Sequence, residues 1–142
     1  MPIDGRYIGF ELPAFTVLVT AQSVRRFADA IGLVGEQDYS VAPPTYMKVI
    51  EAEGNSSRAI VSALQIDLRR VLHIEQQFEY EAPIRVDDCV TVERTVTDIY
   101  TKRNGVLEFV VIDSKMHNRN GVSLGRSRQT ILVRNGPSAA PP

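Results

Sequence analysis

Residues 32–54 read GLVGEQDYSVAPPTYMKVIEAEG, an irregular polar stretch followed by a short apolar one. Pro43 and Pro44 suit the first turn of a helix, because the proline ring holds φ near the helical value. The apolar residues that follow cover most of a helical circumference: Tyr46, Met47, Val49, Ile50 and Ala52. A helix that is apolar nearly all round is usually buried. We therefore expect a central helix that the rest of the chain is built to cover.

The start of this helix is a candidate binding site. Neither Val41 nor Ala42 offers a capping side chain, so the N–H groups of Thr45 and Tyr46 are expected to lack helical partners. Such donors can hold a ligand oxygen. The alternative is that Ser40 or water satisfies them.

Composition limits the class of protein. The 142 residues, 44% of them hydrophobic, fit one domain with a single core. A net charge of -1 gives no support to nucleic acid or an anionic membrane as a partner. The single cysteine, the lack of a membrane-spanning apolar run and the lack of a signal-peptide core favour a soluble cytoplasmic protein. Two histidines and one cysteine form no metal-binding pattern, and no cofactor is expected.

Side-chain periodicity predicts the elements before and after the central helix. Residues 15–19 alternate like a short strand, and residues 20–31 show helical spacing that ends at Gly32. Residues 59–64 fit one or two helical turns. A long strand starts at residue 71 and stops at Pro83, with one face that is apolar and the other polar. Its apolar face is expected to hold Leu72, Ile74, Phe78 and Tyr80.

Two Asn-Gly pairs, at residues 104–105 and 120–121, separate the last strands. Asn-Gly is a strong hairpin signal because both residues tolerate positive φ. Strands are therefore expected at residues 89–100, 106–117 and 122–134, joined as an antiparallel meander. The segment LEFVVI within 106–117 is apolar on both faces, so it should be the central strand.

One helix before a run of long antiparallel strands predicts an α+β protein with a single hot-dog fold, in which the sheet wraps around the central helix. Residues 1–134 form this domain, and residues 135–142 form a disordered tail. A sheet that covers one helix still has a free edge, so a dimer is expected.

Three segments together resemble the MaoC-like dehydratase and (R)-specific enoyl-thioester hydratase family, in particular its N-terminal-type hot-dog domains. They are VRRFADAIG at 24–32, APPTY at 42–46 and VLHIEQQFEYEAPIRVDD at 71–88. The resemblance spans most of the chain. It implies acyl-CoA or acyl-carrier-protein thioesters as substrates and a second hot-dog chain as a partner.

Catalytic members of that family carry an Asp and a His in a pattern close to D-x-N-P-x-H after the first helix. A base must move the proton next to the thioester carbonyl, and an acid or base must handle the water. Aligned after Gly32, the family Asp falls on Leu33 and the family His on Asp38. Both expected residues are absent.

The resemblance therefore implies a subunit that binds the acyl group while a partner supplies the dyad of a (3R)-hydroxyacyl-thioester dehydratase or enoyl-CoA hydratase. Alone, the chain should be weak or inactive. The candidate substrate-binding residues are Thr45, Tyr46, Met47 and Ile50. The alternative for the last three is an ordinary place in the core.

Two other interpretations stay open. In the first, the chain is a self-sufficient homodimeric hydratase, with Glu36 and Asp38 as catalytic acid and base after burial raises one pKa. In the second, it is a non-catalytic module that binds an acyl thioester or another hydrophobic small molecule. His73 is expected to be a surface or hydrogen-bonded residue, and two aspartates before Cys89 disfavour a thiolate there.

Overall fold

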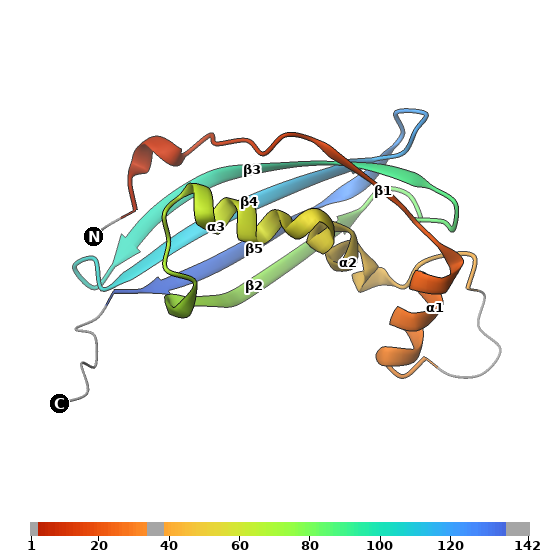
Figure 1. Ribbon diagram of the computed structural model, residues 1–142, viewed down its shortest axis with the longest axis horizontal. Coiled ribbons are helices and arrows are strands. Elements are labelled where there is room, and N and C mark those ends of the chain that lie inside the picture. The colour runs from red at the N-terminus through yellow and green to blue at the C-terminus, as the bar shows by residue number, and fades with distance from the viewer. Residues whose placement is uncertain (1–2, 34–38, 136–142) are drawn as a thin grey trace.

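The computed structural model describes residues 3–33 and 39–135, which form one antiparallel sheet curved around a helical layer (Figure 1). The strand order is β1-β3-β4-β5-β2. The strands are β1 (Phe15–Leu18), β2 (Val71–Tyr80), β3 (Cys89–Lys102), β4 (Leu107–His117) and β5 (Ser123–Arg134). The helices are α1 (Ala21–Ala30), α2 (Met47–Ala52) and α3 (Ser56–Ala63), with 3-10 turns at Gly5–Tyr7, Pro44–Tyr46, Glu53–Asn55 and Leu68–Arg70. This is the α+β hot-dog fold expected from the sequence.

β3, β4 and β5 form the predicted antiparallel meander. Asn104 and Gly105 take positive φ values of 55° and 83°, as a tight hairpin requires. β4 is the middle strand of the sheet. Its apolar run is buried on both faces, at Phe109, Val110, Val111 and Ile112. The expectation that LEFVVI is central is confirmed.

β2 differs from the predicted strand in where its side chains point. A bulge between His73 and Glu75 shifts its register against β5. As a result Val71 and Phe78 both pack into the core, although they are an odd number of residues apart, and Leu72 is 49% exposed. The prediction that Leu72 and Phe78 share an apolar face is wrong, because one inserted residue moves later side chains to the opposite face.

The helical layer crosses the inner face of the sheet. α1 begins at Thr20, whose hydroxyl accepts the Ser23 N–H at 3.1 Å. α2 and α3 run on from each other and are broken at Gly54, whose φ is 66° (Figure 1). The expected central helix is α2, and it is continued by α3, which begins three residues before the helical turns predicted at 59–64. No helix in residues 3–33 or 39–135 is long and apolar enough to cross a bilayer.

The N-terminal segment covers one edge of the sheet. The Gly9 N–H donates to the Val96 carbonyl at 2.7 Å, and the Leu12 N–H donates to the Arg94 carbonyl at 3.0 Å. Figure 1 shows this segment running along β3 before β1 begins. At the opposite edge, the outer side of β2 has no backbone partner among the described residues. The short β1 forms the rest of the edge that the N-terminal segment covers, and the ten-residue β2 is the longer open edge.

The last described residue, Asn135, follows β5 and is still held by a backbone hydrogen bond. The Asn135 N–H donates to the Val106 carbonyl at 2.7 Å. Residues 136–142 lie outside the described residues, so the disordered tail and its boundary stay predictions.

Candidate functional site: a buried polar network under the central helix

The core is divided into two apolar clusters beneath the helical layer. One contains Ile50 of α2 and the other contains Ile60 of α3. On β3, Val92 belongs to the first cluster and Val96 to the second. Between them, on the same face of the strand, is Arg94, which is 1% exposed. A charged side chain thus occupies the boundary between the two clusters.

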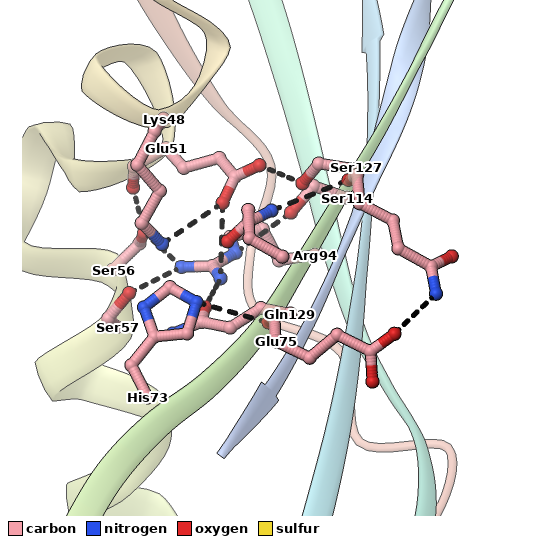
Figure 2. A network of polar contacts seen from close by, with 12 residues as sticks. Lys48, Glu51, Ser56, Ser57, His73, Glu75, Arg94, Ser114, Ser127 and Gln129 are labelled. Carbon is pink, nitrogen blue, oxygen red and sulfur yellow. Dashed lines mark hydrogen bonds and ion pairs between the residues drawn. The ribbon is translucent and has the colours of Figure 1, made fainter. Parts of the chain in front are cut away.

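A polar row continues from Arg94 across the sheet. Arg94 lies opposite Ser114 on β4, and Ser114 lies opposite Ser127 on β5. Gln129 follows two residues later on β5, and all these side chains are buried. Figure 2 shows the row meeting polar side chains from α2 and the start of α3.

The Arg94 guanidinium donates to side chains from the sheet and from the helix. Its Nε donates to the Ser114 hydroxyl at 3.0 Å, and its Nη2 donates to Gln129 Oε1 at 2.7 Å. Its Nη1 donates to the hydroxyls of Ser56 and Ser57 at 2.8 and 2.9 Å. Arginine has five N–H donors in a rigid fork, and a buried guanidinium needs most of them satisfied. Here the fork ties α3 to three strands.

Glu51 supplies the negative charge of the network. Its carboxylate lies 3.6 Å from Arg94 Nη2 and 3.4 Å from Lys48 Nζ, and both Glu51 and Arg94 side chains are fully buried. The other carboxylate oxygen accepts the Ser127 hydroxyl, and the Ser56 hydroxyl donates to the Glu51 backbone carbonyl. One carboxylate is thus shared by a hydroxyl and two cations.

Burial controls the protonation of these groups. It raises the pKa of Glu51, and the positive charges of Arg94 and Lys48 offset only part of this effect. Burial likewise lowers the pKa of Lys48, with a further contribution from the Arg94 charge. The pKa of His73 on β2 is lowered first by burial and next by the Lys48 charge. At neutral pH His73 is therefore a neutral neighbour of the network.

The role of the network follows from the fact that its two buried charged groups have all their hydrogen-bonding atoms occupied. Both Glu51 oxygens have partners, and the Arg94 nitrogens are bonded on every side. Such a closed set holds the α2–α3 pair in one position on the sheet, since breaking it leaves a buried charge without compensation. Lys48, whose side chain is 33% exposed, and the partly exposed Ser57 connect the network to solvent.

The predicted substrate-binding residues are split between surface and core. Thr45 is exposed at the helix start. Tyr46, Met47 and Ile50 are at most 1% exposed and pack in the first apolar cluster. The Tyr46 hydroxyl donates to Ser23 Oγ at 2.7 Å, which ties α1 to the central helix. Their contact with a substrate stays a prediction.

The donors at the helix start are not both available. The chain enters as a 3-10 turn with no side-chain cap, as expected. However, the Tyr46 N–H donates to the Pro43 carbonyl at 2.9 Å, so the expectation that this donor is free is wrong. The 3-10 turn supplies a backbone carbonyl as the partner of this N–H.

The candidate acid and base, Glu36 and Asp38, lie outside the described residues. Their catalytic use therefore stays a prediction. Leu33, the last described residue before this gap, donates its N–H to the Ala28 carbonyl at 2.9 Å. An aliphatic side chain stands where the resembled family carries its Asp, and it has no proton to exchange.

Sequence reasoning missed the network, although signals for it exist. Arg94 occupies a core-facing position in the alternation of Val90, Val92 and Val96, and Glu51 follows Ile50 on an otherwise apolar helix. A charge at a core position in each of two elements that pack together indicates an ion pair.

A cavity of about 480 Å³ lies beyond the end of α3, remote from the network. Its apolar lining includes Leu64, Ile66 and Val133. The buried Glu108 carboxylate on its wall accepts the Ile3 N–H at 2.5 Å and the Asn135 side-chain amide. No predicted site residue among the described ranges lines this cavity.

The sheet topology and the wrapped helix define a single hot-dog domain. The family model described as "FAS1-like, dehydratase domain region" matches residues 6–125. The chain belongs to this family. It is also 30% identical, over 94% of its own length and 95% of the relative's, to a UPF0336 protein of Thermobifida fusca.

Two solved structures share the fold. One is the C-terminally truncated HadBC (3R-hydroxyacyl-ACP dehydratase) complex from Mycobacterium tuberculosis, with a TM-score of 0.71 and 16% identity over 89% of this chain and 96% of that one. The other is a MaoC-like dehydratase from Phytophthora capsici, with a TM-score of 0.75 and 18% identity over 95% of this chain and 50% of that one. The resemblance noted from the sequence is confirmed at the level of fold and family.

Proposed function

We propose that this chain is the non-catalytic, acyl-binding subunit of a (3R)-hydroxyacyl-thioester dehydratase or enoyl-thioester hydratase, and that it pairs with a catalytic hot-dog chain. The reaction adds or removes water across the C2–C3 bond of the acyl group. It needs a base, an acid and donors for the developing enolate oxygen. The observation that carries the proposal is the placement of the only two histidines in the sequence.

Neither histidine is placed to replace the missing dyad. His117 ends β4 and alternates with the buried Met116, so it lies on the sheet face that the helices leave uncovered. His73 lies on β2, where its Nε2 contacts the Glu75 carbonyl at 3.2 Å, in line with the expected hydrogen-bonded histidine. A partner that supplies Asp and His completes the chemistry.

The open edge supports a partner. Edge strands with free backbone groups are sites for pairing with another chain, and β2 is such a strand here. The Mycobacterium tuberculosis structure with the same fold is the HadBC (3R-hydroxyacyl-ACP dehydratase) complex. A hot-dog chain seated on β2 would extend the sheet and bring its own loops close to the central helix.

The predicted acyl site is compatible with this assignment. Thr45 is the exposed member of the set and can meet a thioester directly. Tyr46, Met47 and Ile50 pack in the apolar cluster next to it and are the proposed acyl-facing residues. The chain then contributes binding and water exclusion, and the partner contributes proton transfer.

Hydration assays test the proposal. The purified chain is assayed alone and with each co-encoded small hot-dog chain, on crotonyl-CoA, on longer 2-enoyl-CoA thioesters and on the same acyl groups carried by acyl carrier protein. We expect no turnover from the chain alone and turnover from one pair. Replacing the partner's Asp or His should abolish that turnover, because acid or base catalysis contributes about 10²- to 10⁴-fold.

Two results would contradict the proposal. Full activity of the chain alone, lost in Glu36→Gln or Asp38→Asn, would establish a self-sufficient hydratase. Calorimetric binding of acyl-CoA without turnover in any pairing would instead establish a binding module.

A further inference from the structure

The open edge carries three exposed apolar side chains beside charged ones. Leu72, Ile74 and Tyr80 of β2 are 49%, 47% and 40% exposed. Exposed edges of stable monomers usually carry charges that oppose pairing. Charges also occur on β2, at Glu75 and Glu79, so it is the three apolar side chains that favour burial against another protein chain.

Lys48 connects the buried network to this edge. Its ammonium contacts the buried Glu51 carboxylate, while a third of its side chain remains in solvent. Figure 2 shows Lys48 and His73 on the helical side of β2, with Arg94 deeper in the fold. The charge of Lys48 acts on His73 of β2. A chain that pairs with β2 and reaches this helical side would also cover Lys48.

The charges around Lys48 do not balance. Glu51 is the single carboxylate of the network, and it faces two cations, Lys48 and Arg94. Neutral His73 adds no negative charge. Water at the exposed part of Lys48 now stabilises the excess positive charge, and burying that cation without an anion is costly.

We propose that Lys48 selects the partner: the chain that covers β2 presents an Asp or Glu carboxylate to Lys48, and a second copy of this chain does not. This inference rests on the proposed function, since it assumes a hot-dog partner at that edge. It adds the chemistry by which the partner is recognised.

A second copy lacks the required carboxylate on its own β2. Glu79 points to the outer face of the sheet and pairs with Arg126 at 2.5 Å. Glu75 lies on that outer face too, where it accepts the Gln77 amide. In a two-fold dimer the same surface faces itself, so both copies bring the same excess positive charge to one interface. Like charges across an interface oppose association.

Self-association of the purified full chain tests the inference. Sedimentation equilibrium is run on wild type, Lys48→Met and the matched control Lys115→Met, which changes a lysine on the outer sheet face. We expect Lys48→Met to dimerise about tenfold or more tightly than wild type, and Lys115→Met to match wild type. Raising NaCl from about 0.01 to about 1 M shortens the Debye length from about 30 to about 3 Å, so it should tighten wild-type dimers and leave Lys48→Met unchanged.

Mixing wild type with the Lys48→Glu variant supplies a carboxylate opposite the wild-type Lys48. Size-tagged wild type mixed with Lys48→Glu should form 1:1 heterodimers more tightly than either protein self-associates. Circular dichroism confirms that Lys48→Glu is folded; if it is not, the Lys48→Met and salt measurements decide alone.

Three results would overturn the inference. They are wild-type dimers as tight as those of Lys48→Met, no heterodimer with folded Lys48→Glu, and weaker wild-type dimers after Glu53→Gln, which would show that exposed Glu53 of a second copy pairs with Lys48. These measurements need no catalytic partner. If the self-association measurements contradict the role of Lys48, the proposed function is unaffected. If the hydration assay fails, the self-association measurements can still be interpreted.

Discussion

The Arg94 guanidinium lies 3.6 Å from the Glu51 carboxylate, and neither side chain is exposed to solvent. Arg94 comes from the sheet and Glu51 from the central helix, so this contact joins the two layers of the fold. A buried pair contributes little net stability compared with an apolar pair of the same shape. Its larger effect is to penalise any position of the helix that separates the two charges.

Arg94→Met should destabilise the fold by about 3–5 kcal/mol, because it leaves the Glu51 carboxylate buried without its main partner. Urea unfolding followed by circular dichroism measures the change. The matched control is Arg128→Met on the outer face, where Arg128 pairs with Asp113 at 2.7 Å in solvent. That exposed pair should cost about 1 kcal/mol or less.

The double variant Arg94→Met/Glu51→Leu separates the charge penalty from the loss of packing. Removing both charges leaves no uncompensated ion, so the double variant should be more stable than Arg94→Met alone. A double variant as unstable as the sum of the two single variants would show that the two charges do not interact.

The sheet was predictable from the sequence because its signals are local. The Asn-Gly turns and the apolar LEFVVI segment identify β3, β4 and β5 without tertiary information. The bulge at His73 was not predictable, since alternation on both sides of an inserted residue looks continuous in one dimension. The same limit applies to the site. Arg94 and Glu51 are 43 residues apart, as their numbers show, and only the packing of helix on sheet brings them together.

The stability of the fold should depend on pH through Glu51. Its pKa is raised in the folded state by burial, above the ordinary value of 4.5. The folded state thus holds the proton more tightly than the unfolded state does, so the contribution of this group is fully present below pH 4.5 and is lost as pH rises through the folded pKa. The difference in unfolding free energy between wild type and Glu51→Gln should therefore change above pH 4.5, in favour of the variant. A pH-independent difference would contradict the raised pKa.

Tyr46→Phe should cost about 0.5–1.5 kcal/mol, because it removes the hydrogen bond from the Tyr46 hydroxyl to Ser23 Oγ. The ring remains, including its edge-to-face contact with Phe27 at 5.6 Å. Ser23→Ala removes the same bond from the other side, so a double-mutant cycle by thermal unfolding should show coupling between the two. Additive single effects would mean that this bond does not join α1 to the central helix.

Gly125→Ala should be the most damaging small substitution on β5. Gly125 has φ of 133°, and an added Cβ would lie 2.1 Å from the backbone carbonyl oxygen of Glu79 on β2. Backbone cannot move aside as a side-chain tip can, so β2 must shift away from β5. The matched control is Gly121→Ala, which also has positive φ (77°) but meets nothing within 4 Å, and whose cost should be limited to about 1–3 kcal/mol of local strain. Urea unfolding should rank Gly125→Ala well below Gly121→Ala. Because β2 is the open edge, Gly125→Ala should also weaken pairing with the catalytic chain more than Gly121→Ala does, and equal pairing in both variants would place the partner elsewhere.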